Sequence, residues 1–197
     1  MNAFEALFWS LGASWQFSVF YPFIVLIFSG FIAVYFLSSK ISSTGLRLSL
    51  TFLLGLLPAV IYFVFYPIYE SDVGNNPRIV LLEQGKAVTI STFEVITLPN
   101  CPYCVESIDA IVQLKKRNPD VDVIYKILSS SNNGGHVAAL LKKSKIKYAF
   151  VRHNSDLKKI TKGSFPTFAF RQKGRSDVFV WNNNTFGSCA LDYIEAN

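Results

Sequence analysis

Cysteine, histidine and charge are scarce in this chain of 197 residues. It has three cysteines and two histidines, and charged residues make up only 16% of the sequence. A structural zinc site usually takes four ligands in two spaced pairs. Here Cys101 and Cys104 form the one closely spaced pair, and Cys189, His136 and His153 supply no second one. We therefore predict no metal site and no cofactor.

Charge is missing altogether from two long stretches. No charged residue occurs in 6–39 or in 48–69. Within them, 17–37 and 46–68 are each long enough to cross the roughly 30 Å hydrocarbon core of a membrane as a helix. The alternative is two buried helices of a soluble protein, which a chain of this size could hardly cover. We predict a membrane anchor over residues 1–69.

The first sixteen residues lack the basic start of a signal peptide and a convincing cleavage site. Phe4, Leu7, Leu11 and Trp15 recur at helical spacing. This pattern predicts a short helix in the membrane interface, with its tryptophans near the headgroups. A disordered leader is the alternative.

The charges that flank the two apolar stretches predict an orientation. The link at 38–45 carries Lys40, and Arg47 begins the second span, whereas the leader carries only Glu5. Because positive residues near membrane spans favour the cytoplasmic side, we expect a two-pass protein with both termini outside.

The rest of the chain divides into a linker with a first strand at 70–84 and an α/β domain at 85–197. Alternating strand and helix patterns favour a mixed central sheet flanked by helices. The expected strands are 78–82 and 87–90, forming a hairpin around Gln84-Gly85, then 93–98, 121–128, 147–151, 168–171 and 178–181. The expected helices are 105–117, 136–143, one capped by Asn154 or Ser155 and ending at Gly163, and a last one from Thr185 or Phe186 to Ala196.

The net charge of +6 does not point to nucleic acid. The basic clusters at 115–117, 142–147 and 158–159 each fall at the end of an expected helix, where cations are favoured. No aromatic residues alternate with them on one face. We interpret these clusters as solvated surface and expect no nucleic-acid partner.

The two close cysteines fall between an expected strand and an expected helix. Cys101 would lie at the helix N-terminus, where unpaired N–H groups and the helix dipole favour a thiolate. Cys104 would lie one turn further on, near enough to close a disulfide, and Pro102 suits a first helical turn. The spacing indicates a redox-active disulfide, with an inert buried pair as the alternative.

These residues resemble the thioredoxin superfamily over about 85–197. The resemblance depends on a strand, the C-x-x-C and a helix, followed by Phe165-Pro166-Thr167, a strand, a glycine turn, a strand and a closing helix. One additional strand–helix pair between 121 and 163 is similar to membrane-anchored thioredoxin-like proteins of bacterial cell envelopes. The dipeptide Pro102-Tyr103 is of the glutaredoxin type. The resemblance implies a protein of the bacterial inner membrane, and the charge bias around the spans implies that its catalytic domain lies on the periplasmic side.

The resemblance also implies roles for particular residues. Phe165–Pro166 is expected to be a cis peptide bond whose loop packs against the cysteines and pairs with substrate. Pro102, Tyr103, Phe165, Pro166 and Thr167 are therefore candidate redox-tuning and substrate-binding residues, next to catalytic Cys101 and Cys104.

A proton-transfer residue is harder to assign. Thioredoxins often carry a buried acid six residues before the first cysteine, where this chain has Val95. Glu94, which alternation turns to the other face of the strand, and Glu106 are candidates. We interpret both more readily as plain surface or helix N-terminal carboxylates. We expect Cys189 to be an inert core residue, and His136 and His153 to be structural.

The sequence thus predicts a membrane-anchored thiol–disulfide oxidoreductase that exchanges disulfides with protein substrates, in a direction left open. The two spans hold no cysteine and cannot relay electrons between thiols. A separate membrane or soluble redox partner is therefore expected. The alternative is a membrane-tethered binding or assembly module without essential redox turnover.

Overall fold

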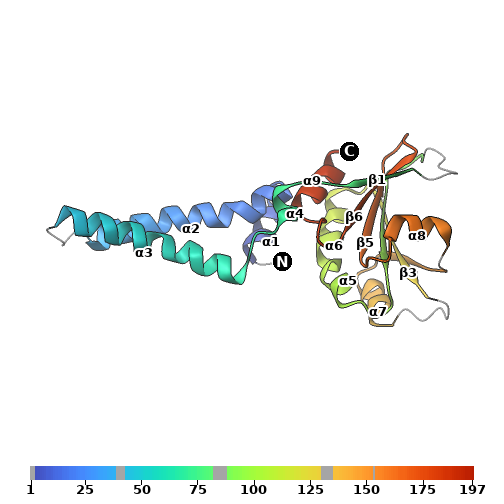
Figure 1. The fold of residues 1–197 in the computed structure, drawn as a ribbon, viewed down its shortest axis with the longest axis horizontal. Helices are drawn as coiled ribbons and strands as arrows, with labels where there is room; N and C mark the ends of the chain where they lie inside the picture. The colour runs from blue at the N-terminus through green and yellow to red at the C-terminus, as the bar shows by residue number, and fades with distance from the viewer. Residues whose placement is uncertain (1–2, 39–42, 82–87, 130–134, 153) are drawn as a thin grey trace. The chain divides into compact units, whose positions relative to one another are not determined.

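The computed structural model describes residues 3–38, 43–81, 88–129, 135–152 and 154–197. The chain forms two compact units, Met1–Val73 and Gly74–Asn197, and each is described by itself (Figure 1).

The N-terminal unit is helical. It consists of α1 (Ala3–Ser10), α2 (Trp15–Leu37), α3 (Thr44–Phe65) and the single turn α4 (Glu70–Val73). The hydroxyl of Ser14 accepts the Phe17 N–H at 3.1 Å and caps α2, so this helix begins two residues before the expected span. Helix α3 ends at Phe65, three residues earlier than expected, just ahead of Pro67. Residues that precede a proline are disfavoured in helical conformation.

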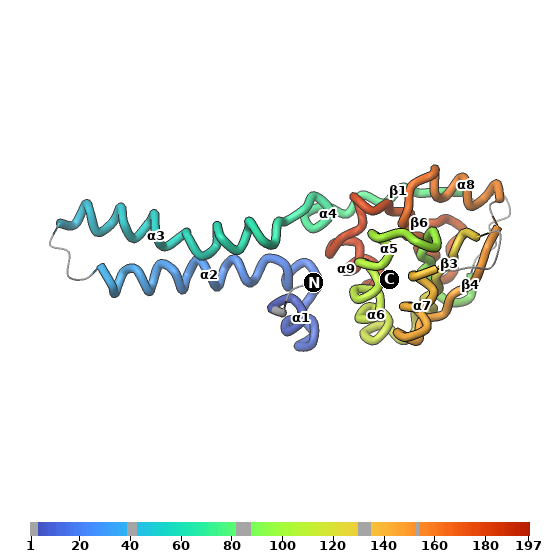
Figure 2. Tube along the Cα trace, turned by 90° about the horizontal axis from the view of Figure 1, so that it is seen from below, coloured from blue at the N-terminus to red at the C-terminus, as the bar shows by residue number. Residues whose placement is uncertain are grey.

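Helices α2 and α3 lie side by side (Figure 2). They approach each other closely at two glycines, because a Cβ on Gly30 would lie 2.2 Å from the carbonyl oxygen of Gly55. Many of their large apolar side chains remain exposed, such as Phe28 at 64% and Phe52 at 64%. By length and composition both helices could cross a membrane.

The C-terminal unit is built on a six-stranded mixed sheet in the order β1-β6-β5-β2-β3-β4. Strand β2 lies inside the sheet, parallel to β3 and antiparallel to β5. The strands are β1 (Arg78–Leu81), β2 (Thr92–Thr97), β3 (Asp122–Leu128), β4 (Lys147–Val151), β5 (Thr167–Arg171) and β6 (Asp177–Asn182). The helices are α5 (Pro102–Glu106), α6 (Ile108–Arg117), α7 (Gly135–Lys143), α8 (Ser155–Thr161) and α9 (Ser188–Ala196).

Helices cover both faces of this sheet, with α8 on one face and α6 and α9 on the other (Figure 1). Leu157 and Ile160 of α8 pack into an apolar cluster with Ile96 and Val180. On the opposite face, the rings of Phe168 and Phe186 stack with centroids 3.8 Å apart. The mixed sheet between helices, with the cysteine pair after an interior strand, confirms the thioredoxin-like fold class.

The hairpin expected at 78–90 is wrong. Strand β1 pairs antiparallel with β6 at the sheet edge, and residues 88–90 form no strand. Two contacts explain the difference. The Arg78 guanidinium donates to the carbonyls of Lys159 and Ile160 at the end of α8. The Val88 carbonyl accepts a hydrogen bond from the Gly174 N–H.

The other boundaries differ by a few residues. The helix expected at 105–117 is divided at Ser107 into α5 and α6. The short helix α8 is capped by Asn154, whose Oδ1 accepts the Leu157 N–H at 2.8 Å, and it ends at Thr161 before left-handed Lys162. The predicted turn at 84–85, most of the loop 129–135, Lys40 and His153 lie outside the described residues.

Candidate functional site

Cys101 and Cys104 form a disulfide in this structure. The two sulfur atoms are 2.10 Å apart and the Cα atoms 5.3 Å apart. Cys101 is 7% exposed, whereas Cys104 is completely buried. An attacking thiolate therefore meets the sulfur of Cys101 first.

The pair is positioned by the start of α5. Cys101 is the N-cap of this helix, Pro102 follows at its first turn, and the Cys104 N–H donates to Cys101 Sγ at 3.3 Å. An N–H directed at this sulfur would stabilise a thiolate there once the disulfide is reduced. Tyr103 projects from the same turn and is 56% exposed.

A half-buried serine and a buried tyrosine lie close to Cys104. The Ser107 hydroxyl donates to the Cys104 carbonyl at 3.0 Å, which accompanies the break between α5 and α6. The Tyr125 hydroxyl lies beside Ser107, but makes no hydrogen bond of ordinary geometry to any described residue. Burial raises the pKa of Tyr125, so its hydroxyl stays neutral in the folded protein. No local sequence pattern marks either residue as part of the site.

The loop before β5 reaches the same end of the sheet as the cysteines. The Phe165–Pro166 peptide bond is cis. Thr167 is the register partner of Ile96 near the end of β2, from which the chain runs on to Cys101. Pro166 and Thr167 are buried and Phe165 is half-buried, while the Thr167 hydroxyl donates to the Ser164 carbonyl.

Glu94 lies on the sheet face that carries Ile96, as strand alternation predicts. It is 6% exposed, and its Oε1 lies 2.8 Å from Lys126 Nζ and 3.4 Å from Arg171 Nε. Val95, with the opposite orientation, is fully buried beside its register partner Tyr125. Glu94 therefore has a structural ion-pair partner on each neighbouring strand.

The remaining candidates are Glu106, His136 and Cys189. Glu106 and His136 are exposed, and Cys189 is a half-buried residue of α9 rather than a fully buried core residue. Across the described segments, no group of three or more His, Cys, Asp or Glu side chains could hold a metal ion.

Two hydrogen bonds at the site have no local signature in the sequence. Asn100, which directly precedes Cys101, accepts the His136 N–H at 3.3 Å through its side-chain Oδ1. The neighbouring Pro99 carbonyl accepts the Val137 N–H at 3.3 Å. The two segments that these bonds join are about 35 positions apart, so no local pattern predicts the contact.

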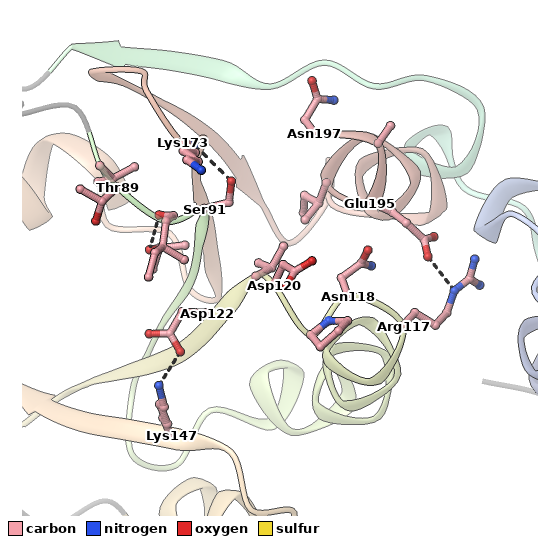
Figure 3. Close-up of a pocket in the computed structure, with 17 residues that line it drawn as sticks. Thr89, Ser91, Arg117, Asn118, Asp120, Asp122, Lys147, Lys173, Glu195 and Asn197 are labelled. Carbon is pink, nitrogen blue, oxygen red and sulfur yellow. Dashed lines mark hydrogen bonds and ion pairs between the residues drawn. The ribbon is translucent and has the colours of Figure 1, made fainter.

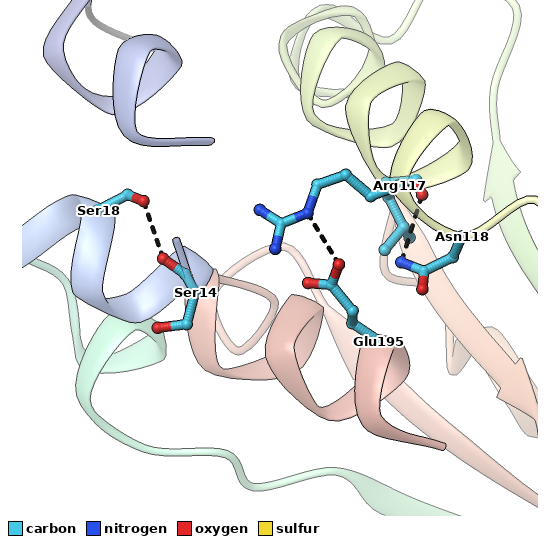
Figure 4. A network of polar contacts seen from close by, with 6 residues as sticks. Ser14, Ser18, Arg117, Asn118 and Glu195 are labelled. Atoms are coloured by element: carbon cyan, nitrogen blue, oxygen red, sulfur yellow. Dashed lines mark hydrogen bonds and ion pairs between the residues drawn. The ribbon is translucent and has the colours of Figure 1, made fainter. Parts of the chain in front are cut away.

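An open groove of about 1230 Å³ occupies the opposite end of β2 and β3 (Figure 3). Its wall holds the ion pairs Lys147–Asp122, at 2.6 Å, and Arg117–Glu195, at 2.8 Å. The second of these links α6 to α9 (Figure 4). Since Thr92 begins β2 and Cys101 follows its end, the groove is separate from the disulfide site.

No protein-family model and no curated protein sequence matches the chain. Similar solved structures include a secreted disulfide oxidoreductase of Mycobacterium tuberculosis homologous to E. coli DsbE. It is 15% identical over 55% of this chain and 81% of that one, with a TM-score of 0.44. An exposed lipoprotein thioredoxin of Streptococcus pneumoniae is 14% identical over 62% and 100%, with a TM-score of 0.44. StoA of Bacillus subtilis is 16% identical over 61% and 98%, with a TM-score of 0.37.

Proposed function

We propose that the chain is a membrane-anchored thiol–disulfide oxidoreductase that acts on protein substrates through Cys101 and Cys104. The observation that carries this proposal is the disulfide at the start of α5, in which Cys101 is slightly exposed and Cys104 is completely buried. This asymmetry assigns different tasks to the two cysteines.

In the reducing direction, the Cys101 thiolate attacks a substrate disulfide and forms a mixed disulfide, which releases the first substrate thiolate. The Cys104 thiolate then attacks Cys101 Sγ and releases the second. The substrate gains two electrons, and the protein is left with the Cys101–Cys104 disulfide. The reverse sequence oxidises a substrate dithiol.

Exposed Tyr103 and the Phe165–Pro166 loop are the proposed substrate contacts. Tyr103 offers an apolar ring next to Cys101, and the loop lies at the same end of the sheet. Pro102 begins α5 without leaving an N–H unpaired, which keeps Cys101 at the N-cap.

Two features support the proposed anchoring in the bacterial inner membrane, with the catalytic domain on the periplasmic side. Helices α2 and α3 are apolar enough to span it. Lys40 and Arg47 lie in the link and at the start of the second span, whereas the nearest cation on the other side, Arg78, lies further from the spans. Because 1–100 contains no cysteine, a separate membrane or soluble partner has to recycle the disulfide.

Substrate trapping tests this function. Cys104→Ala removes the resolving thiol, so mixed disulfides between Cys101 and substrate proteins should accumulate on non-reducing gels. Cys101→Ala should trap nothing, and Cys189→Ala, which changes a thiol remote in sequence from the C-x-x-C, should behave as the unmodified chain. If Cys101→Ala preserves the function in cells, the protein is instead a tethered binding or assembly module.

A further inference from the structure

Helix α7 begins against the two residues that precede Cys101. Its His136 and Val137 N–H groups donate to Asn100 Oδ1 and to the Pro99 carbonyl, each at 3.3 Å. Val137 is fully buried. Two N–H groups in the first turn of α7 therefore donate to Pro99 and Asn100, the two residues that lead into Cys101 and that are called the redox loop below. Asn100 thus caps α7 from a distant part of the chain.

Gly135 makes this approach possible. A Cβ at this position would lie 2.2 Å from Asn100 Oδ1 and 2.8 Å from the Pro99 carbonyl oxygen. Its φ of +54° also lies in the left-handed region, which favours glycine. Space and backbone conformation thus both require glycine where α7 meets the loop.

We propose that Asn100 is a positioning residue that docks the N-terminus of α7 onto the redox loop and thereby sets the Cys101–Cys104 dithiol–disulfide equilibrium. The inference rests on the proposed function. It assigns a task to the strand–helix pair of α7 and β4, which the sequence identified as additional to a minimal thioredoxin.

The physical link is electrostatic. A helix N-terminus carries partial positive charge that favours a nearby thiolate. Docking holds the end of α7 beside the residues that lead into Cys101, in addition to the N-terminus of α5 on which Cys101 itself lies. A stabilised thiolate stabilises the reduced form. Loss of docking should therefore shift the equilibrium toward the disulfide.

The test uses the full chain in detergent micelles, with Cys189→Ser in every sample, equilibrated in glutathione redox buffers. Asn100→Ala and Gly135→Ala remove the docking from opposite sides. Both should raise the equilibrium constant for disulfide formation by about two- to fivefold, the size of a helix-end effect. Both should also raise the pH midpoint for alkylation of reduced Cys101.

Two matched variants make the test specific. Asn154→Ala removes the cap of α8, and Gly174→Ala places a side chain at φ +79° with no atom within 4 Å. Each should lower stability and leave the equilibrium and the alkylation midpoint unchanged.

If the Asn100 and Gly135 variants match these controls while the unmodified chain exchanges with glutathione, the inference is wrong and the proposed function stands. If the unmodified chain does not exchange at all, the proposed function itself fails. Should one docking variant fail to fold, the other decides, because they alter different segments.

Discussion

At the scale of single residues, replacing Glu94 shows whether this side chain is a structural carboxylate or a proton-transfer residue. Its two cationic neighbours, Lys126 and Arg171, are 24% and 20% exposed in their side chains. Glu94→Gln removes the charge that compensates them. We expect it to lower the free energy of unfolding by about 1–3 kcal/mol, less than for a fully buried pair because the cations still reach water.

Two quantities are measured for the chain in micelles. Far-ultraviolet circular dichroism monitors its unfolding in urea, and glutathione redox buffers give the equilibrium between the Cys101–Cys104 dithiol and disulfide. The equilibrium constant for formation of the Cys101–Cys104 disulfide should stay within about twofold of that of the unmodified chain. A twofold change corresponds to only about 0.4 kcal/mol. Asp177→Asn, which breaks a pair with half-exposed Arg175, is the control and should cost at most about 1 kcal/mol. A large loss of exchange activity in Glu94→Gln would instead make Glu94 a proton-transfer residue.

Tyr125 predicts a dependence of stability on alkaline pH. Burial raises its pKa in the folded state above the ordinary value of 10.0. The stabilisation from this group is therefore complete below pH 10. It is lost progressively as the pH rises from 10 through the folded pKa, because the tyrosine then ionises in the unfolded chain but not in the folded one. Tyr125→Phe should remove this loss. Between pH 9 and pH 11 its stability relative to the unmodified chain should improve by about 1.4 kcal/mol.

Urea unfolding at several pH values measures this difference. Tyr103→Phe is the matched control, because the Tyr103 side chain is 56% exposed, and its stability should follow the unmodified chain. Equal pH profiles for Tyr125→Phe and Tyr103→Phe would contradict the buried, neutral state of the Tyr125 hydroxyl.

Local sequence identifies some residues of the candidate site and misses others for a physical reason. Cys101, Pro102 and Cys104 lie within one helical turn, so their spacing alone indicates the N-cap geometry that the structure has. Asn100 and Gly135 are 35 positions apart, and their contact depends on how α7 is placed after β3. The orientation of Tyr125 toward Ser107 likewise follows from the pairing of β2 with β3.

At the scale of elements, the close approach of α2 and α3 depends on two glycines. Gly30→Ala places a methyl group against the Gly55 carbonyl, which should force the helices apart and cost about 1–3 kcal/mol, as overpacking does. Gly45→Ala, with no atom within 4 Å of the added Cβ, is the control.

Cross-linking reports this separation. Ser38 Oγ and Thr51 Oγ1 are 3.4 Å apart, so cysteines at these two positions should oxidise readily in a chain whose native cysteines are serine. Gly30→Ala should reduce the yield of this disulfide and Gly45→Ala should not. Unchanged yields in both would show that the helices do not depend on the glycine contact.

Some elements could be predicted closely from the sequence, whereas the edge of the sheet at β1 could not. The uncharged apolar run 17–37 and the expected strand 147–151 each correspond to an element with boundaries within two residues. The first strand was assigned to a local hairpin, because adjacent β-prone segments usually pair with each other. Its actual partner, β6, is about 100 residues away, and the Arg78 contact with α8 that anchors it has no local signature.

At the scale of the whole molecule, charge and cysteine are distributed between two units with different tasks. The unit Met1–Val73 carries the apolar helices, and the unit Gly74–Asn197 carries all three cysteines. In the proposed two-pass arrangement, the side of the membrane that the cysteines face decides the available substrates and recycling partners. The predicted orientation depends on only two cations, Lys40 and Arg47, against Glu5 in the leader.

Labelling of intact cells with a membrane-impermeant maleimide tests this orientation, in a Cys189→Ser chain where only Cys101 and Cys104 report. We expect labelling of the intact cells. Labelling without added reductant would identify an outward, reduced pair that needs an electron donor. Labelling only after an impermeant reductant would identify an outward disulfide that serves oxidation or isomerisation, with the 7% exposed Cys101 reacting before buried Cys104.

The matched control places a single cysteine at the opposite membrane side. Thr44→Cys, at the start of α3, in a chain whose native cysteines are serine, should be labelled only after lysis. The reverse pattern, with Thr44→Cys labelled in intact cells and the Cys101–Cys104 pair protected until lysis, would invert the topology. The pair would then face the cytoplasm, where glutathione and thioredoxin keep most thiols reduced, and the proposed exchange would have to run as a reduction.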